Sequence, residues 1–294
     1  MANLKEVRTR IESVKSTEQI TNAMKMVAAS KLRKAQRSIQ HMRPYAKKLN
    51  EIITDITATA DIAADNQFTV VHNEECTKKL VVVLSSNRGL CGPFNAHIVK
   101  ATLRVIEHEI EQPLADHLDM VFIGKKAFEY FKKNDYPVKA VFNELLDDIS
   151  YQKISALAQS VMDDFLLGLY EKVYIIYNRF ENATVQTPTV EQFLPVKSLK
   201  HHEDADYPDS HIYEPEKKEL LDELVPRALK IQFFKTVLDT NASEQGARMT
   251  AMHQATDNAR ELLKDLQLSY NKARQAAITN EIIEIVGGAE ALNS

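Results

Sequence analysis

Residues 4–56 read LKEVRTRIESVKSTEQITNAMKMVAASKLRKAQRSIQHMRPYAKKLNEIITDI. Positions spaced alternately three and four residues apart, from Leu4 to Ile56, are apolar in thirteen of sixteen cases. A 3.5-residue repeat kept over so many turns holds one seam of a helix against a partner and is typical of a left-handed coiled coil. At about 1.5 Å per residue the helix would be on the order of 80 Å long, so we expect it to project from any globular domain.

Three consecutive seam positions carry polar side chains, namely Glu18, Thr21 and Lys25. Along the same stretch, apolar side chains occupy another face of the predicted helix, at Ile20, Met24 and Val27. Because coiled-coil seams favour apolar side chains, this switch predicts that something other than the partner helix contacts the stretch.

A second long helix is predicted at the far end of the chain, because no proline follows Pro226 and only three glycines interrupt a helix-forming composition. Its clearest seam carries many small side chains: Met252, Ala255, Ala259, Leu262, Leu266, Ser269, Ala273 and Ala276. The two helices are far apart in sequence, so they are expected to pair antiparallel across an inserted domain. Pro44 lies within the first helix and is expected to kink it or divide it in two.

Between the two helices, short β-rich runs alternate with helical patterns. Buried strands are predicted at 79–85, 119–123 and 172–177, and weaker ones at 138–143 and 184–194, where Pro188 favours an edge position. Helices are predicted at 96–111, 125–133 and 150–170. This alternation predicts a mainly parallel sheet with helices on its faces, a Rossmann-like α/β domain. A polar stretch, 200–215, then leads to the second helix.

The composition excludes several classes of protein. A hydrophobic fraction of 44% over 294 residues fits a folded chain with a buried core. The longest apolar run, Leu80–Leu84, is far short of the roughly 20 residues that span a membrane, and neither a signal nor a transit pattern begins the chain. We therefore expect a cytoplasmic protein. Its two cysteines, Cys76 and Cys91, are expected to be reduced thiols.

The charge distribution is uneven. Residues 1–48 carry twelve Lys and Arg against three Asp and Glu, although the whole chain has a net charge of −4. The basic end is expected to face an acidic protein surface, because it has neither the interleaved aromatic residues nor a motif typical of nucleic-acid binding.

The loop Ser85–Asn95 follows the first predicted strand, where doubly wound proteins bind phosphate. It lacks the glycine spacing of a dinucleotide site and the lysine of a P-loop, so a structural turn is favoured. Cys91 would be a nucleophile only if a base such as His97 lowered its pKa. The histidines of an acidic segment match no metal-ligand spacing: His201, His202 and His211. No catalytic, cofactor-binding or metal-binding residue is predicted.

Four segments, in order along the chain, resemble the γ subunit of F-type ATP synthases. They are RIESVKSTEQITNAMKMVAASKLR at 10–33, RGLCGPFN at 88–95, ASEQGARMTAMHQATDNA at 242–259 and ITNEIIEIVGGA at 278–289. The resemblance implies an antiparallel coiled coil of both termini with a Rossmann-like domain at its foot. It also implies rotation inside a hexamer of alternating α and β subunits, with the foot against the ε subunit and the membrane ring of c subunits, and catalysis by β alone.

The resemblance also implies contact residues. Met24, Lys25, Lys31 and Arg33 match positions that face acidic segments of the β subunits. Positions that hydrogen-bond to loops of the surrounding ring are matched by Arg248, Arg274, Gln275, Thr279 and Glu281. An apolar tip would serve as a non-directional bearing: Ile282, Ile283, Ile285 and Val286. For the polar positions, a solvated or coil-stabilising role is an equal alternative.

Departures from the family pattern affect these expectations, among them His253, which stands where a lysine is common. No long insertion with paired cysteines follows Leu194, so thiol regulation is not expected. Gly246 replaces a bulkier residue, and glycine inside a helix weakens it by roughly 1 kcal/mol relative to alanine, so a soft point is predicted there.

The predicted division of the chain is 1–62 and 216–290 for the paired helices and 76–196 for the α/β domain. The protein is expected at the cytoplasmic face of the bacterial inner membrane, as a peripheral subunit. Two other classes remain open: an enzyme that uses the Ser85–Asn95 loop, and a free coiled-coil scaffold or nucleic-acid binder.

Overall fold

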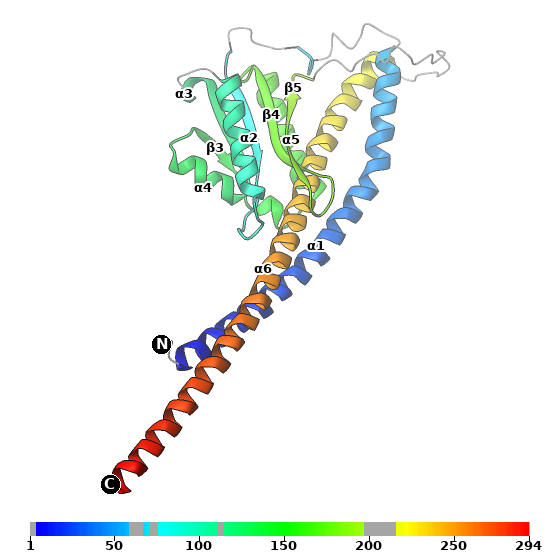
Figure 1. The fold of residues 1–294 in the computed structure, drawn as a ribbon. Coiled ribbons are helices and arrows are strands. Elements are labelled where there is room, and N and C mark those ends of the chain that lie inside the picture. Colours follow the sequence, from blue (N-terminus) through cyan, green and yellow to red (C-terminus); the bar gives the residue numbers. More distant parts are fainter. Residues whose placement is uncertain (1–3, 59–66, 71–75, 111–113, 197–215, 294) are drawn as a thin grey trace. The chain divides into compact units, whose positions relative to one another are not determined.

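The computed structural model describes residues 4–58, 67–70, 76–110, 114–196 and 216–293 (Figure 1). Long helices stand at the two ends, α1 (Leu4–Ala58) and α6 (Lys217–Asn293), with an α/β domain between them in sequence. The contacts divide the chain into two units, one formed by 29–248 and the other by both end segments, 1–28 and 249–294. The predicted fold class is confirmed.

Among the described residues, the α/β domain forms a five-stranded sheet in the order β3-β2-β1-β4-β5. Its strands are β1 (Lys79–Leu84), β2 (Leu118–Ile123), β3 (Val138–Val141), β4 (Lys172–Phe180) and β5 (Gln186–Leu194). The first four are parallel, and β5 runs antiparallel to β4 at the edge. Pro188 therefore lies on an edge strand, as predicted, where its missing backbone donor costs least.

Helices cover both faces of the sheet. They are α2 (Phe94–Glu109), α3 (Leu114–His117), α4 (Lys125–Lys133) and α5 (Tyr151–Leu166), with a 3-10 turn at Glu144–Leu146. Side chains of β1 alternate between the faces: Val81 and Val83 pack with α2 and α4, whereas Leu80 and Val82 pack with α5 and α6. The central strand is thus buried on both sides, which accounts for its unbroken apolar sequence.

In α6, residues 236–247 are buried almost throughout, although many of them are polar. One side packs on the sheet through Phe233 and Val237. Nearer its start, α6 packs on α1, where Leu221 and Ile231 meet Leu49 and Ile53. The apolar core of the α/β domain and the helix pair are therefore joined through α6 within the unit 29–248.

Both long helices continue through their prolines. Helix α1 is assigned as one helix across Pro44, so the predicted division in two does not occur. Helix α6 begins before Pro226 and contains it. The polar stretch 200–215, with His201, His202 and His211, lies outside the described residues. Within the described residues, no helix is long and apolar enough to cross a membrane.

The two end segments pair antiparallel in their own unit. Thr256 Oγ1 donates to Thr21 Oγ1 at 2.9 Å, and Arg260 Nε lies 3.0 Å from Glu18 Oε1. All predicted seam positions of α1 from Leu4 to Ala28 are buried or half-buried. Two of the predicted polar exceptions, Glu18 and Thr21, thus contact α6.

The seam predicted for α6 is wrong by one position over part of its length. Leu262, Ser269 and Ala276 are exposed, whereas Leu263 and Tyr270 are half-buried. The observed seam follows a regular 4-3 spacing: Met252, Thr256, Ala259, Leu263, Leu266, Tyr270 and Ala273. The prediction favoured small apolar residues over Thr256, which is buried because its hydroxyl is satisfied by Thr21 and by the carbonyl of Met252.

Replacing Leu263 with aspartate is expected to destabilise the pairing of the end segments by about 2 kcal/mol, because a carboxylate would lose water at the seam. Leu262→Asp is the matched control, since that side chain is 40% exposed and should tolerate the charge. Thermal unfolding followed by circular dichroism would compare the two variants. Equal losses at both positions would contradict the observed seam.

Candidate functional site

The Ser85–Asn95 loop leaves the carboxyl end of β1 and leads to α2. Its first residue is fixed to β2 and α4: Ser85 N donates to Ile123 O at 2.8 Å, and Ser85 Oγ accepts from Ala127 N at 3.1 Å. The loop thus begins at the edge where parallel α/β sheets place their ligand sites.

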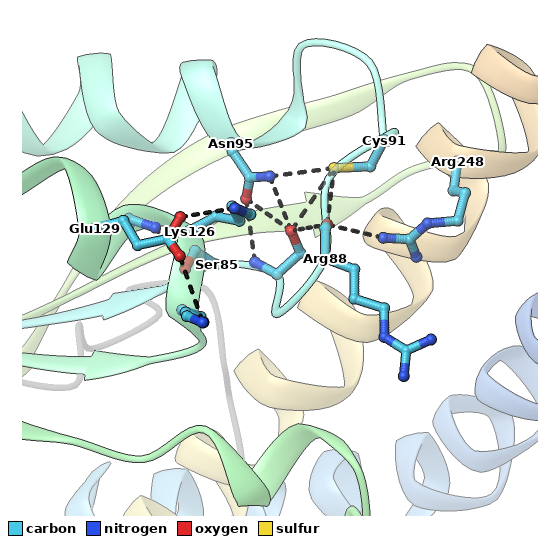
Figure 2. A network of polar contacts seen from close by, with 10 residues as sticks. Ser85, Arg88, Cys91, Asn95, Lys126, Glu129 and Arg248 are labelled. Carbon is cyan, nitrogen blue, oxygen red and sulfur yellow. Dashed lines mark hydrogen bonds and ion pairs between the residues drawn. The ribbon is translucent and has the colours of Figure 1, made fainter.

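Polar side chains within the loop bond to one another (Figure 2). Asn95 Oδ1 accepts from the backbone N of Ser86 at 3.1 Å, and Asn95 Nδ2 lies 3.2 Å from Cys91 Sγ. Ser86 Oγ donates to the carbonyl of Arg88 at 2.7 Å. Two residues have positive φ, Leu90 at 62° and Gly92 at 57°. The loop is a compact turn whose polar groups are largely used internally.

Cys91 does not have the surroundings of a nucleophile. Burial raises the pKa of its thiol, with smaller opposing effects from the Ser86 hydroxyl and from Arg248. The thiolate is therefore scarce at neutral pH. His97 is exposed on α2, and no hydrogen bond joins it to Cys91 among the described residues. The geometry supports the structural interpretation of this loop.

Arg248, on α6, binds the outside of the loop. Its Nη2 donates to the carbonyls of Arg88 at 3.1 Å and Gly89 at 3.3 Å. Its Nη1 lies 2.7 Å from Glu244 Oε1, one turn earlier, and both side chains are about nine-tenths buried, at 12% and 10% exposed. Burial raises the pKa of the Glu244 carboxyl, which Arg248 opposes. An arginine predicted as a partner contact is thus engaged within its own chain.

A groove of about 330 Å³ adjoins this pair. Charged side chains from four segments line it: Lys31, Lys34, Arg88, Asp147, Asp148, Glu244 and Arg248. Lys31 also lowers the pKa of Glu244, in the same direction as Arg248. The groove therefore brings the predicted contact residues Lys31 and Arg248 together.

Gly246 packs closely against the β4–β5 turn. A Cβ atom there would lie 3.2 Å from the carbonyl oxygen of Ala183 and 3.3 Å from its Cα. The glycine therefore permits a close approach of α6 to the sheet, and this gives it a role other than the predicted soft point.

The remaining predicted contact residues lie on exposed surface or at the helix seam. Met24 and Lys25 are half-buried, and Arg33 is exposed. All described side chains from Arg274 to Gly288 are exposed, including Gln275, Thr279 and Glu281. The apolar tip is 54–66% exposed at Ile282, Ile283, Ile285 and Val286. An apolar surface of this kind on a helix end is typical of an interaction site.

The sequence analysis did not predict three residues of these networks. Glu244 stands four residues before Arg248, a spacing that predicts a helical ion pair. Thr256 offered no such signal, because its partner Thr21 lies 235 positions earlier. The partners of Asn95 are close in sequence, Ser86 and Cys91, but their bonds depend on the fold of the loop.

The chain thus has an α/β domain inserted between two long terminal helices whose end segments pair antiparallel. The family model described as ATP synthase matches residues 3–292. The ATP synthase gamma chain of Christiangramia forsetii is 49% identical over the whole of both chains, and that of Cytophaga hutchinsonii is 48% identical, again over the whole of both. The chain belongs to the ATP synthase gamma chain family.

Solved structures agree on the fold. The chain aligns with a chain of the Euglena gracilis mitochondrial ATP synthase, OSCP/F1/c-ring, at a TM-score of 0.69 and 22% identity, covering 98% of this chain and 94% of that one. It also aligns with a chain of the Tetrahymena thermophila mitochondrial ATP synthase central stalk and c-ring, at a TM-score of 0.58 and 23% identity, covering 80% and 99%.

Proposed function

We propose that this chain is the rotating shaft of an F-type ATP synthase. It turns inside a hexamer of α and β subunits and couples transmembrane ion flow to ATP synthesis or hydrolysis on β. The observation that carries the proposal is full-length identity of 48–49% to gamma chains. The chain itself is non-catalytic in this proposal.

Rotary coupling needs an asymmetric object whose contacts with each catalytic site change as it turns, because only differential binding shifts a conformational equilibrium. Two paired helices of unequal length supply such asymmetry. In the end-segment unit, α6 continues beyond Ala273, the last seam residue, with every described side chain exposed as far as Gly288. This single helix is suited to contact a ring around it.

The proposed ring contacts fall into three sets. Basic and apolar side chains on α1 face acidic segments of β: Met24, Lys25, Lys31 and Arg33. Polar side chains on α6 hydrogen-bond to ring loops: Arg274, Gln275, Thr279 and Glu281. The apolar tip, residues 282–286, forms a bearing in which non-directional contacts offer little resistance to rotation.

The α/β domain is proposed to bind the ε subunit and the ring of c subunits. The proposed division of the chain is 1–62 and 216–290 for the shaft and 76–196 for this domain. The protein would then sit at the cytoplasmic face of the bacterial inner membrane as a peripheral subunit, and would bind no nucleic acid.

Cross-linking the shaft to a β subunit is expected to abolish coupled ATP synthesis, since the shaft could no longer turn. Lys31→Cys provides an exposed thiol on α1, with Cys76→Ser removing the more accessible native thiol and Cys91 left buried. A disulfide to a cysteine placed in the acidic segment of β would be formed in membranes. ATP synthesis would be measured before and after reduction.

Reduction should restore synthesis, and the same membranes without the β cysteine serve as the control. Persistent synthesis in the cross-linked complex would contradict rotation. Failure of α and β subunits to co-purify with the chain would contradict the assignment itself, and nucleotide turnover by the isolated chain would favour an enzyme.

A further inference from the structure

The side chain of Arg248 is surrounded by acceptors from its own chain. A guanidinium presents its donors in a rigid planar fork, so it can join several acceptors at once. Here one arm of the fork meets Glu244 Oε1 at 2.7 Å, and the other meets the carbonyls of Arg88 and Gly89. With only 12% of the side chain exposed, little of it remains for a partner.

The carbonyl oxygen of Arg88 accepts hydrogen bonds both from within the loop and from α6. Ser86 Oγ donates to it from within the loop, and Arg248 Nη2 donates to it from the helix (Figure 2). Next to it, Leu90 has a φ of 62° and is 65% exposed. This left-handed conformation is costly for a residue with a side chain.

Close to Arg248 along the sequence, helix α6 is also hydrogen-bonded to strand β4. Ser243 Oγ donates to the carbonyl of Asn178 at the end of β4, at 2.9 Å. Asn178 Nδ2 in turn donates to Phe94 O at the start of α2, at 3.2 Å. Together with the close approach at Gly246, these contacts hold one turn and a half of α6 against three parts of the α/β domain.

We propose that Arg248 is a positioning residue that locks the Ser85–Asn95 loop to α6 and transmits torque between the α/β domain and the shaft. It does this through directional hydrogen bonds, which resist sliding of the helix along the loop. It is not itself a contact with the surrounding ring. The inference rests on the proposed function, and it replaces the ring contact that the family resemblance implies for this residue.

The test uses two variants and a control, in the full chain and in the assembled complex. Arg248→Met combined with Glu244→Met removes the lock without leaving a buried charge unpaired. Arg248→Lys keeps the charge but replaces the planar fork with a compact ammonium group. Arg227→Ala, an exposed arginine on the same helix, is the matched control.

In the full chain without partners, the double variant is expected to increase amide hydrogen exchange in residues 86–92 by about tenfold. In the complex, its ratio of ATP-driven ion pumping to ATP hydrolysis is expected to fall by about twofold or more, since torque is lost before it reaches the α/β domain. Arg248→Lys should recover part of both effects, and Arg227→Ala should change neither.

Unchanged hydrogen exchange in the partner-free double variant would contradict the proposal that Arg248 locks the loop to α6. If, in addition, the variant bound the α and β subunits more weakly, Arg248 would instead be a contact with the ring. Faster exchange with an unchanged pumping ratio would show that the lock carries no torque. Failure of the wild-type chain to assemble or pump would instead contradict the proposed function.

Discussion

Replacing Gly124 with alanine is expected to destabilise the α/β domain by more than about 4 kcal/mol, because the backbone there has no room for a side chain. Gly124 joins β2 to α4 with a φ of 104°, a conformation that L-residues rarely adopt. An added Cβ would lie 2.1 Å from the carbonyl oxygen of Ser85 and 2.7 Å from its carbon. Either the end of β1 at Ser85 or the end of β2 at Gly124 must move to relieve this clash. Denaturant unfolding of the full chain would measure the loss.

Gly89→Ala is the control, because nothing lies within 4 Å of a Cβ at that position and its φ is not in the left-handed region. That variant should be neutral or stabilised by up to about 1 kcal/mol through the unfolded state. A Gly124→Ala protein as stable as Gly89→Ala would show that Ser85 can move away at little cost. In that case the hydrogen bonds of the Ser85–Asn95 loop, which begins at Ser85, would also tolerate such a movement.

The sequence predicted elements whose pattern depends only on the identity of neighbouring residues. The apolar run of β1 and the helical spacing of α5 require no knowledge of a partner, and both lie where they were predicted, within a few residues. Gly124 and Gly89 cannot be told apart in this way, since the difference between them is the distance to Ser85. The local sequence pattern contains no information on which distant residues lie close together in the fold.

The seam of α6 failed for a related reason. The predicted seam took Ala255 in place of Thr256, and Leu262 and Ser269 in place of Leu263 and Tyr270. The hydroxyl of Thr256 is satisfied by Thr21, 235 positions earlier, which allows the threonine to be fully buried. Counting apolar residues along the helix cannot identify a buried polar residue whose hydrogen-bond partner is distant in sequence. The predicted seam was therefore shifted by one residue over part of the helix.

The candidate site was predicted only in part. The position of the Ser85–Asn95 loop followed from the strand before it and the helix after it. Arg248 was matched to a ring contact by resemblance, but the sequence could not reveal that the carbonyls of Arg88 and Gly89 lie beside it. The apolar tip was implied by the family resemblance, and its exposure reflects the end of the seam at Ala273.

Phe233→Ala is expected to cost about 3–5 kcal/mol, the range for truncating a fully buried phenylalanine. Phe233 is fully buried and meets the ring of Phe193 on β5 edge-on, with centroids 5.6 Å apart. The substitution would leave a cavity between α6 and the sheet. Calorimetry of the full chain should therefore show a lower unfolding temperature for the α/β domain.

Phe234→Ala is the control on the adjacent position. Phe234 is half-buried, packs at the margin of the core and meets the exposed Tyr151 edge-on at 5.5 Å, so its loss should cost about 1–2 kcal/mol. Similar losses at both positions would contradict the packing of α6 on the sheet through Phe233. The comparison also separates two kinds of attachment. Phe233 stabilises α6 on the sheet through apolar packing, which has no preferred direction, whereas Arg248 and Ser243 determine the position of α6 along the sheet through directional hydrogen bonds. Losing Phe233 should therefore lower stability with little change in the exchange of residues 86–92 below the unfolding temperature.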